Sequence, residues 1–244
     1  MKGHKICFLS GNALKIIAAL SMLIDHIGYV FMPQNMALRI IGRLAFPIFA
    51  FMISEGCKYT KNKTRYFLTM FSFAFAYQLI FMEFHDMSVM VTFSLSILGI
   101  FALDNAKNML FEKEANVYQK LLACGLFISI VFFVYILNKL LSIEYGIWGF
   151  LMPVAASIPH FPKQINAKIL NKLDSVPIRL LCMSIPMAQL AVGMKWVQWY
   201  SFISLLPLIL YSGKRGSWNM KYFFYIFYPL HLILIYGIYY LTVY

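Results

Sequence analysis

Long apolar stretches, separated by short polar segments, follow one another along the whole chain. A bilayer core about 30 Å thick requires roughly 20 apolar residues of helix at 1.5 Å per residue. Two segments fall short of that length, 145–158 and 197–211, which is typical of tilted, re-entrant or half-broken helices. The expected fold is an all-α polytopic transmembrane bundle of about nine spans (eight to ten), one domain over residues 1–244. The nine predicted segments are 13–32, 37–57, 66–84, 88–106, 119–138, 145–158, 177–193, 197–211 and 220–242.

The composition points to the same class of protein. Hydrophobic residues make up 61% of the 244 residues and charged residues 12%, whereas a soluble domain has about 45–50% apolar and ~25% charged residues. Because the apolar residues are spread over the whole length, most of the chain must face the lipid bilayer. The composition therefore excludes a soluble enzyme and leaves no room for a soluble domain beside the helices.

The net charge of +12 is explained by membrane topology. With the N-terminus inside, the inner segments hold sixteen of the 21 Lys and Arg residues and the outer segments hold three, as the positive-inside rule requires. This predicts a cytoplasmic N-terminus and an outer C-terminus. Nucleic acid, a usual partner of basic soluble chains, is not expected, because the sequence has no base-reading or stacking motif. The inner residues are Lys2, Lys5, Lys58, Lys61, Lys63, Arg65, Lys107, Lys113, Lys120, Lys163, Lys168, Lys172, Arg179, Lys214, Arg215 and Lys221, and the outer ones are Arg39, Lys139 and Lys195.

Two other features of the sequence are interpreted without invoking function. The four cysteines have neither the spacing of a disulfide framework nor that of a metal site, so no metal is expected. The first apolar segment follows a basic start, as in a signal peptide, but Asp25 and His26 interrupt it and no small-residue cleavage site follows. A retained helix is therefore expected. The cysteines are Cys7, Cys57, Cys124 and Cys182.

Ionisable side chains inside apolar segments are expensive in a membrane and mark candidate functional sites. In the first segment, LKIIAALSMLIDHIG, Asp25 and His26 lie two to three turns deeper than Lys15, whose side chain can snorkel to the interface. Only helix positions three or four apart share a face, so Asp25 cannot readily orient its neighbour His26. Each of the two is therefore expected to find a partner on another helix.

The second segment, RIIGRLAFPIFAFMISEG, provides one such partner. Arg39 and Arg43 share a face, and Pro47 leaves the carbonyl of Arg43 without its helical hydrogen bond. A break at membrane depth is tolerated where polar groups or neighbouring helices satisfy the freed backbone. An arginine, a free carbonyl and a kink at one level therefore indicate a built site.

The last segment contributes His231, which follows Pro229 and lies at a depth comparable with that of His26. Asp25, His26, Arg43 and His231 are thus predicted to form a buried catalytic or proton-relay site. The alternative is a polar network that only holds helices together. Other polar residues have a simpler interpretation. Glu55, Asp104 and Glu144 lie near helix ends, where solvation explains them at least as well as function, and Gln78, Thr92, Gln189 and Gln198 are interpreted mostly as packing residues.

Several strings of residues along the chain match those of a known family. They are LIDHIG, ALRIIGRLAFPIFAFMISEG, the basic KYTKNKTRYF, EYGIWG and KYFFYIFYPLHLILIY, and DHIG, GRLAFPIFAF and YPLHL are the most specific. They resemble the TraX family over most of the chain, which implies an integral protein of the bacterial cytoplasmic (inner) membrane that N-acetylates pilin. One departure is that many relatives carry Ser-Glu-Ile-Pro in the third helix, where this chain reads AYQLIFM with Gln78 near the expected acid. If that acid binds the acceptor, the acceptor here can differ.

A wider similarity links the chain to integral-membrane acyltransferases of the third family. Those carry a basic residue eleven positions before a histidine in the first helix, and Lys15 and His26 have this spacing, with lysine in place of the usual arginine. Their last helix carries a Tyr-Pro-Leu-type string and a histidine, as YPLHL does around His231. The similarity implies transfer of an acetyl group from cytoplasmic acetyl-CoA. The acceptor would be an amine or hydroxyl of a pilin-like peptide, an exported glycan or a small molecule.

The site and the resemblance together suggest chemical roles. His26 is expected to be the general base, because an imidazole exchanges protons near neutral pH. Asp25, or whichever carboxylate reaches the ring, is expected to fix its tautomer, and Arg43 to stabilise the oxyanion. Other basic residues are candidate contacts of CoA, with a role as topology signals only as the alternative: Lys15, Arg39, Lys58, Lys61, Lys63, Arg65, Lys214 and Arg215.

Two other functional classes remain open at this point. In a proton-coupled transporter, Asp25, His26 and His231 would form a relay and the Pro-broken helices would gate a path. Such a transporter would be expected to show two-fold repeat symmetry, which the sequence lacks. A non-catalytic assembly subunit would not need the buried His, Asp and Arg set.

Overall fold

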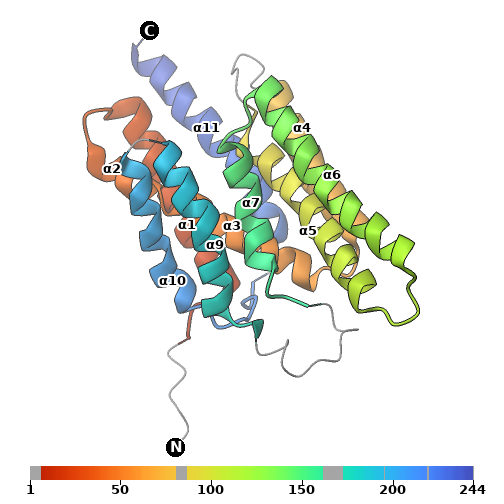
Figure 1. Ribbon diagram of the computed structural model, residues 1–244. Coiled ribbons are helices and arrows are strands. Elements are labelled where there is room, and N and C mark those ends of the chain that lie inside the picture. Colours follow the sequence, from red (N-terminus) through yellow and green to blue (C-terminus); the bar gives the residue numbers. More distant parts are fainter. Residues whose placement is uncertain (1–6, 81–86, 162–172, 195, 219, 244) are drawn as a thin grey trace, which may run out of the picture. The chain divides into compact units, whose positions relative to one another are not determined.

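The computed structural model in Figure 1 describes residues 7–80, 87–161, 173–194, 196–218 and 220–243. Within these ranges the protein is all-helical and has no strand, although two isolated bridges join Leu9 to Tyr211 and Met87 to Ile143. The helices are α1 (Gly11–Phe31), α2 (Met36–Gly42), α3 (Ala45–Tyr59), α4 (Lys63–Ile80), α5 (Val89–Phe111), α6 (Val117–Leu141), α7 (Gly146–Ser157), α9 (Val176–Gly193), the 3₁₀-helix η1 (Trp196–Ser204), α10 (Leu205–Ile209) and α11 (Lys221–Val243).

Each of the nine segments predicted from the apolar pattern overlaps helix in the described residues, and residues 81–84 of the segment 66–84 lie outside them. Six stretches are long and apolar enough to cross a membrane. Of the other three, α7 and the η1–α10 pair are short and apolar, while α4 does not reach the same hydropathy. The number of nine spans and their orientation therefore stay predictions. The six stretches are Gly11–Phe31, Met36–Tyr59, Val89–Phe111, Val117–Leu141, Val176–Gly193 and Tyr222–Thr242.

Two of the predicted irregular segments are irregular for identifiable reasons. The predicted segment 37–57 turns at Arg43 and Leu44, between α2 and α3. Pro47 therefore falls in the first turn of α3, where its missing N–H costs nothing. The segment 197–211 begins within the 3₁₀-helix η1 and continues as α10. That is one of the half-broken forms expected for it.

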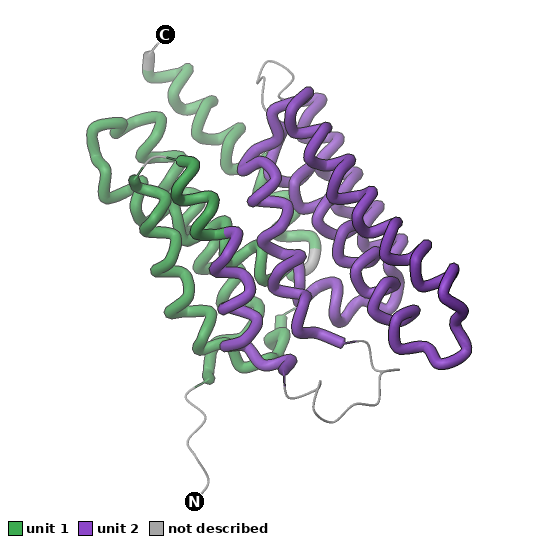
Figure 2. The backbone as a smooth tube through the Cα atoms, in the orientation of Figure 1, with its two compact units in different colours: residues 1–52, 187–244 green, residues 53–186 purple. Residues whose placement is uncertain are grey.

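Contacts between residues divide the chain into two compact units, which are coloured separately in Figure 2. Unit 1 comprises residues 1–52 and 187–244, and unit 2 comprises residues 53–186. Helices α3 and α9 each carry the chain from one unit to the other. The prediction that residues 1–244 form one domain is not tested by this division.

Unit 1 is built around α1. Helix α1 packs against α2 and α11, and α2 also contacts η1. The N-terminus of α1 is held by the loop that follows α10, because the N–H groups of Gly11 and Asn12 donate to the carbonyls of Lys214 and Arg215. The Ser10 side chain caps the same end by accepting from Ala13 N–H, so the first donors of α1 are satisfied.

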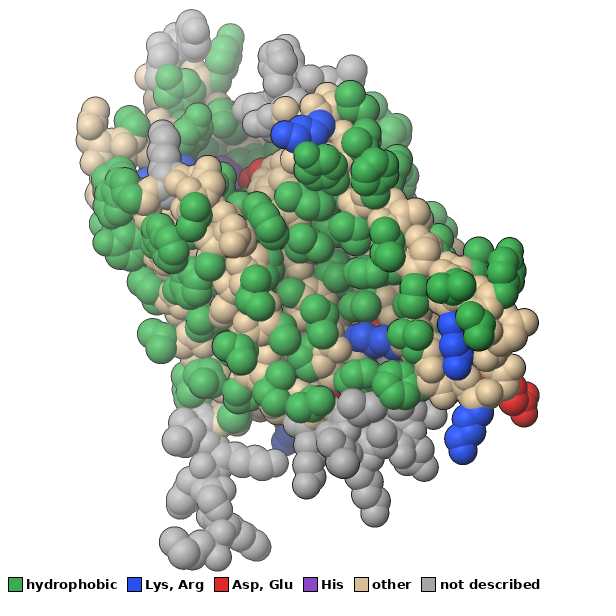
Figure 3. All heavy atoms as spheres, in the orientation of Figure 1, with side chains coloured by type: hydrophobic (Ala, Val, Ile, Leu, Met, Phe, Trp, Pro, Cys, Tyr) green, Lys and Arg blue, Asp and Glu red, His purple; other side chains and the backbone are tan. Residues whose placement is uncertain are grey.

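Unit 2 is built around α5, which packs against α4, α6 and α7. Helix α7 begins at Gly146, which has a positive φ like Tyr145 before it, and most of its residues are buried. Helix α6 is strongly apolar between its polar ends, yet only 11% of this apolar stretch is buried, as expected for a helix that faces lipid. Hydrophobic side chains cover most of the face drawn in Figure 3.

Candidate functional site

Asp25 is held by two arginines in unit 1. Its carboxylate accepts from Arg43 Nη2 at 3.1 and 3.0 Å and lies 3.0 Å from Arg39 Nη1. The side chains of Asp25 and Arg43 are 14% and 13% exposed, so the ion pair lies largely away from solvent. The prediction that Arg39 and Arg43 share one face and that Asp25 finds its partner on another helix is confirmed.

Two glycines allow α1 and α2 to approach closely enough for this cluster. A Cβ at Gly42 would overlap the Asp25 carboxylate, and a Cβ at Gly28 would lie 2.6 Å from the Cβ of Leu38. Both glycines belong to the strings DHIG and GRLAF that the sequence analysis singled out. The absence of a side chain at these glycines therefore lets the two helices pack closely, with the Asp25 carboxylate of α1 against the backbone of α2.

Arg43 is fixed on more than one side. Its Nε donates to the carbonyl of Arg39 at 3.3 Å, and its Nη1 donates to Oε1 of Gln198 at 3.3 Å. Gln198 lies on η1 and is 3% exposed. Gln198 had been interpreted as a packing residue, and that was wrong: it orients a buried guanidinium. The available signal was a Gln in an otherwise apolar segment, but its partner could not be deduced from spacing.

His26 and His231 contact each other across α1 and α11. Their ring centroids are 4.9 Å apart with the rings inclined at 67°, and Nε2 of His231 lies 3.3 Å from Nδ1 of His26. The prediction that the two histidines lie at comparable depths is confirmed. His231 is buried and also stacks on Phe227, with ring centroids 5.1 Å apart.

The hydrogen bonds of the two rings assign their tautomers. Nδ1 of His26 lies 2.8 Å from the carbonyl oxygen of Met22, and Nδ1 of His231 lies 2.8 Å from that of Phe227. Because a carbonyl can only accept, each neutral ring carries its proton on Nδ1 and its lone pair on Nε2. The lone pair of His231 faces His26, whereas Nε2 of His26 makes no hydrogen bond among the described residues.

One predicted contact is not found. Asp25, or whichever carboxylate reaches the ring, was expected to fix the tautomer of His26. The carboxylate of Asp25 pairs with Arg39 and Arg43 instead, and the Nδ1 of His26 lies against the carbonyl of Met22. Adjacent residues of a helix point in different directions, and here Asp25 points toward α2 while His26 points toward α11. The two halves of the site nevertheless share one turn of α1.

Three of the predicted CoA contacts gather near the N-terminus of α1. The backbone of Lys214 and Arg215 docks on Gly11 and Asn12, and their side chains are exposed. Lys15 lies one turn further along α1, with Nζ 5.5 Å from the centre of the Phe224 ring. Arg39, another of these candidates, is instead part of the Asp25 cluster and also lies over the Tyr29 ring at 5.2 Å.

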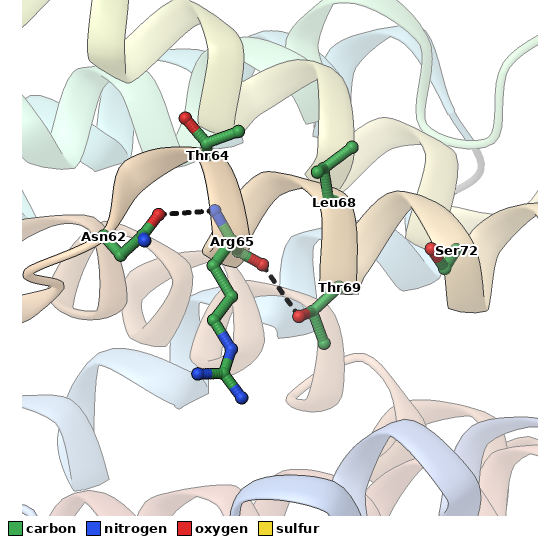
Figure 4. Close-up of a pocket in the computed structure, with 6 residues that line it drawn as sticks. All are labelled: Asn62, Thr64, Arg65, Leu68, Thr69 and Ser72. Carbon is green, nitrogen blue, oxygen red and sulfur yellow. Dashed lines mark hydrogen bonds between the residues drawn. The ribbon is translucent and has the colours of Figure 1, made fainter.

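The other four candidates lie in unit 2 and differ in their surroundings. Lys58 forms an ion pair with Asp174 at 2.7 Å, and Lys63 lies 4.0 Å from Asp104. Lys61 and Arg65 are exposed. Arg65 lines an open pocket of about 370 Å³ at the start of α4, together with Asn62, Thr64, Leu68, Thr69 and Ser72 (Figure 4).

Unit 2 also contains a buried charged network that the sequence analysis did not predict. Arg179 is fully buried and pairs with Glu55, and it also donates to Ser54 Oγ and the carbonyl of Ala156. Glu55 was interpreted as a solvated group near a helix end, and its 3% exposure contradicts that interpretation, whereas Arg179 was counted only among the inner basic residues. Asp104 is likewise 6% exposed.

The same unit contains a histidine–carboxylate contact that spacing did not reveal. His160 Nδ1 lies 2.9 Å from Asp174 Oδ2, which also accepts from Lys58. Burial alone raises the pKa of the Asp174 carboxyl, but the hydrogen bonds from His160 and Lys58 outweigh burial and hold this pKa below its usual value. His160 and Asp174 are separated in the sequence by residues 162–172, which lie outside the described residues.

No group of three or more His, Cys, Asp or Glu side chains in the described ranges could hold a metal ion, and all four cysteines are free. The charged candidates Lys2, Lys5, Lys163, Lys168, Lys172 and Lys195 of the topology prediction lie outside the described residues.

Apolar helices that enclose an arginine–carboxylate cluster and a histidine pair define an integral membrane protein with a buried polar site. The chain belongs to the TraX protein family, whose pattern it matches over residues 10–239. This membership confirms the resemblance seen in the DHIG, GRLAFPIFAF and YPLHL strings, and it fits a pilin-related role.

Two relatives show how far the similarity extends. A probable fimbrial assembly protein, FimC of serogroup H1 from Dichelobacter nodosus, is 24% identical over 246 residues, which cover 93% of this chain and 94% of that protein. An uncharacterized protein of Rickettsia prowazekii is 44% identical over 54 residues, which cover 22% of this chain and 21% of that protein. No solved structure matches the chain significantly.

Proposed function

We propose that this protein is an integral-membrane acetyltransferase that moves an acetyl group from cytoplasmic acetyl-CoA to an amine or hydroxyl. The observation that carries the proposal is the arrangement of His26. Its Nδ1 proton is held by the Met22 carbonyl, and its Nε2 lone pair is free of hydrogen bonds among the described residues. The preceding residue, Asp25, pairs with two arginines, Arg39 and Arg43. A base with a fixed tautomer beside excess positive charge suits acyl transfer.

The proposed chemistry conserves atoms and charge. The acceptor nitrogen or oxygen attacks the thioester carbonyl while Nε2 of His26 takes its proton. The tetrahedral intermediate carries a negative oxygen, which the net positive charge of Arg39, Arg43 and Asp25 stabilises in a low-dielectric site. The carbon–sulfur bond then breaks, and the proton passes from His26 to the leaving CoA sulfur.

The donor would enter along α1. Lys15, Lys214 and Arg215 lie near its N-terminus and would hold the phosphates of CoA. His26 lies about 16 Å deeper than Lys15, at 1.5 Å per residue. An extended pantetheine arm spans a distance of this order, so phosphates at one end and thioester at the other would both find partners.

The proposed orientation follows from the distribution of basic residues. Nine spans with an inside N-terminus in the bacterial inner membrane would leave the CoA contacts in the cytoplasm and the Asp25 site in the outer half of the bilayer. A cysteine substituted for Lys61 should resist external labelling, and one substituted for Asp86, which lies outside the described residues, should react. External labelling at Lys61 in intact cells would overturn this orientation.

The acceptor is proposed from the relatives. The TraX family is linked to pilin acetylation, and the relative of similar length is named as a probable fimbrial assembly protein. The N-terminal amine of a pilin, or another exported molecule, is therefore the proposed acceptor class.

One observation favours a second function, a proton-coupled transporter. The contact between His26 and His231 provides two adjacent proton-binding rings, as in a proton relay. The two functions differ in what the wild-type protein does with acetyl-CoA and with a proton gradient.

The deciding experiment incubates the purified protein with radiolabelled acetyl-CoA and a synthetic peptide that carries a free N-terminal amine. A peptide with a blocked N-terminus and free serine hydroxyls serves as the second acceptor, and His26→Gln as the protein control. Label on either peptide with the wild-type protein alone supports the acetyltransferase. No label on any acceptor, together with His26-dependent proton flux in liposomes, would establish the transporter instead.

A further inference from the structure

Helix η1 presents three buried polar side chains in one row. A 3₁₀-helix has three residues per turn and rises about 2 Å per residue, so side chains three positions apart lie directly above one another. Gln198, Ser201 and Ser204 have this spacing, and they are 3%, 0% and 0% exposed. In an α-helix the same three residues would diverge by roughly 60° per step. The 3₁₀ form, which is uncommon over nine residues, is what aligns them.

The two serines in this row have no hydrogen-bond partner in the part of the chain that the structure describes. Other serines within helices behave differently: Ser94, Ser96 and Ser184 donate to the carbonyl four residues earlier. Buried hydroxyls are normally satisfied, and each exception requires a reason such as a missing ligand. Two such exceptions, one turn apart on the same face of η1, point to a ligand that hydrogen-bonds to both.

The row connects the two ends of the proposed acetyl-CoA site. At one end Gln198 accepts from Arg43, which binds Asp25. At the other end, α10 leads into a loop whose Lys214 carbonyl accepts from Gly11 at the N-terminus of α1. The rise from Gly11 to Asp25 along α1 is about 21 Å, and the rise along η1 and α10 is about the same.

We propose that Gln198, Ser201 and Ser204 form the binding surface for the pantetheine arm of the acyl donor, with the two serine hydroxyls hydrogen-bonded to its amide groups. This proposal rests on the proposed function. The pantetheine arm carries two amides in series, and a hydroxyl can donate to an amide carbonyl or accept from an amide N–H. With the phosphates at Lys214 and Arg215, the arm would follow the row and deliver the thioester to His26.

Both serines are fully buried in this structure, so the arm would enter by displacing the groups that cover them. No covalent step is assigned to the row. Its contribution is affinity for the donor, which makes the expected signature a change in KM for acetyl-CoA with little change in kcat.

The test uses Ser201→Ala and Ser204→Ala, separately and together, with three acetyl donors. Acetyl-CoA has the phosphates and the amides, S-acetylpantetheine has only the amides, and a simple alkyl thioacetate has neither. Each alanine should raise KM about 2- to 12-fold for the first two donors and leave the rate with the alkyl thioacetate unchanged. Replacing Lys214 and Arg215 with Gln should raise KM for acetyl-CoA only.

The melting temperature separates this role from a purely structural one, because a structural role of the two hydroxyls would lower the melting temperature of the alanine variants. Removing an unsatisfied hydroxyl should leave the melting temperature of the ligand-free protein equal or higher, and CoA should stabilise the double variant less than the wild type. Ser94→Ala, which loses a satisfied hydroxyl, is the matched control and should keep the wild-type KM.

The outcomes separate the two proposals. If the wild-type protein transfers acetyl groups and the double variant keeps its KM for S-acetylpantetheine, the row is not the pantetheine surface, while the acetyltransferase stands. If the wild-type protein transfers no acetyl group from any of the three donors and CoA does not stabilise it, the proposed function fails first.

Discussion

Nε2 of His231 lies 3.3 Å from Nδ1 of His26, the nitrogen that already donates to the Met22 carbonyl. The pair is therefore not symmetric. A second proton added to Nε2 of His231 would face the Nδ1 proton of His26, whereas Nε2 of His26 can take a proton without such a conflict. On the proposed function, this asymmetry favours His26 over His231 as the ring that takes the proton, and gives His231 the role of orienting it.

The first prediction concerns this pair. A general base contributes about 10²–10⁴ in rate, so His26→Gln should lower kcat for acetyl transfer by at least two decades while CoA still binds. Glutamine keeps a hydrogen-bonding side chain but cannot take a proton. His231→Gln removes only the orienting contact and should lower kcat by about tenfold.

Steady-state kinetics and CoA-induced thermal stabilisation measure the two effects separately. Wild-type acetyl transfer by His26→Gln would make His26 a structural residue and His231 the next candidate for the base. Equal losses in both variants would contradict the asymmetry between the two rings.

The second prediction concerns Arg43. Its guanidinium binds Asp25 with one edge and Gln198 with another, and a lysine offers a single point charge that cannot occupy both. Arg43→Lys should therefore lower kcat by about tenfold or more although the charge is kept. Gln198→Glu is the comparison, because it keeps an acceptor for Arg43, and it should preserve more activity than Gln198→Leu.

How much of this site could be predicted depends on the distance over which sequence patterns carry information. The helical face shared by Arg39 and Arg43, the divergence of Asp25 and His26, and the depth of His231 all follow from regular helix geometry. Gln198 could not be paired with Arg43 in this way, because the 3₁₀ winding of η1 and its packing on α2 are tertiary features. The apolar pattern was sufficient for the helices but not for the winding of one of them.

The charged residues of unit 2 show a second limit. Glu55 and Arg179 lie near the ends of predicted segments, where solvent exposure is the usual outcome for charged side chains. The structure buries both because α7 ends beside them, and its carbonyls at positions such as Ala156 need donors. Sequence position alone does not reveal that a short helix ends inside the protein.

The third prediction separates two groups of cations. If the phosphates of CoA bind near the N-terminus of α1, replacing Lys214 and Arg215 with Gln should raise KM for acetyl-CoA. Neutralising the unit 2 group should then leave KM unchanged in a protein whose insertion is intact. The reverse result would assign the phosphates to the second group, which is Lys61, Lys63 and Arg65.

The fourth prediction concerns the buried pair of Glu55 and Arg179. Removing one partner of a buried ion pair typically costs about 3–5 kcal/mol, so Arg179→Met should lower the free energy of unfolding by that order. Adding Glu55→Gln to Arg179→Met should recover part of the loss, since it removes the buried charge. Denaturant unfolding in detergent measures all three proteins.

A matched control for this pair is Lys63→Gln. Lys63 lies 4.0 Å from Asp104 and its side chain is 50% exposed, so this change should alter stability by less than about 1 kcal/mol. If Arg179→Met were no more destabilising than Lys63→Gln, the Glu55–Arg179 pair would not contribute to the stability of unit 2.

The fifth prediction concerns the pH dependence of stability through Asp174. Hydrogen bonds from His160 and Lys58 lower the pKa of its carboxyl in the folded protein. The folded state then binds fewer protons than the unfolded state around the ordinary Asp pKa of about 3.9. The resulting stability is fully present above that pH and is lost as the pH falls through the folded-state pKa. Asp174→Asn should therefore be less stable than the wild type by about 1–3 kcal/mol at neutral pH.

The difference between wild type and Asp174→Asn should stay constant from pH 8 to about pH 5 and shrink only in stronger acid. Lys58→Met removes one of the two donors, so the pKa of Asp174 should rise toward its usual value and the loss should begin at a higher pH. Glu112→Gln, at an exposed position at the end of α5, is the control and should change neither the stability at neutral pH nor its pH profile. A difference that shrinks already between pH 8 and pH 6 would mean that a group other than the Asp174 carboxyl governs it, and the neighbouring His160 would be the first to replace.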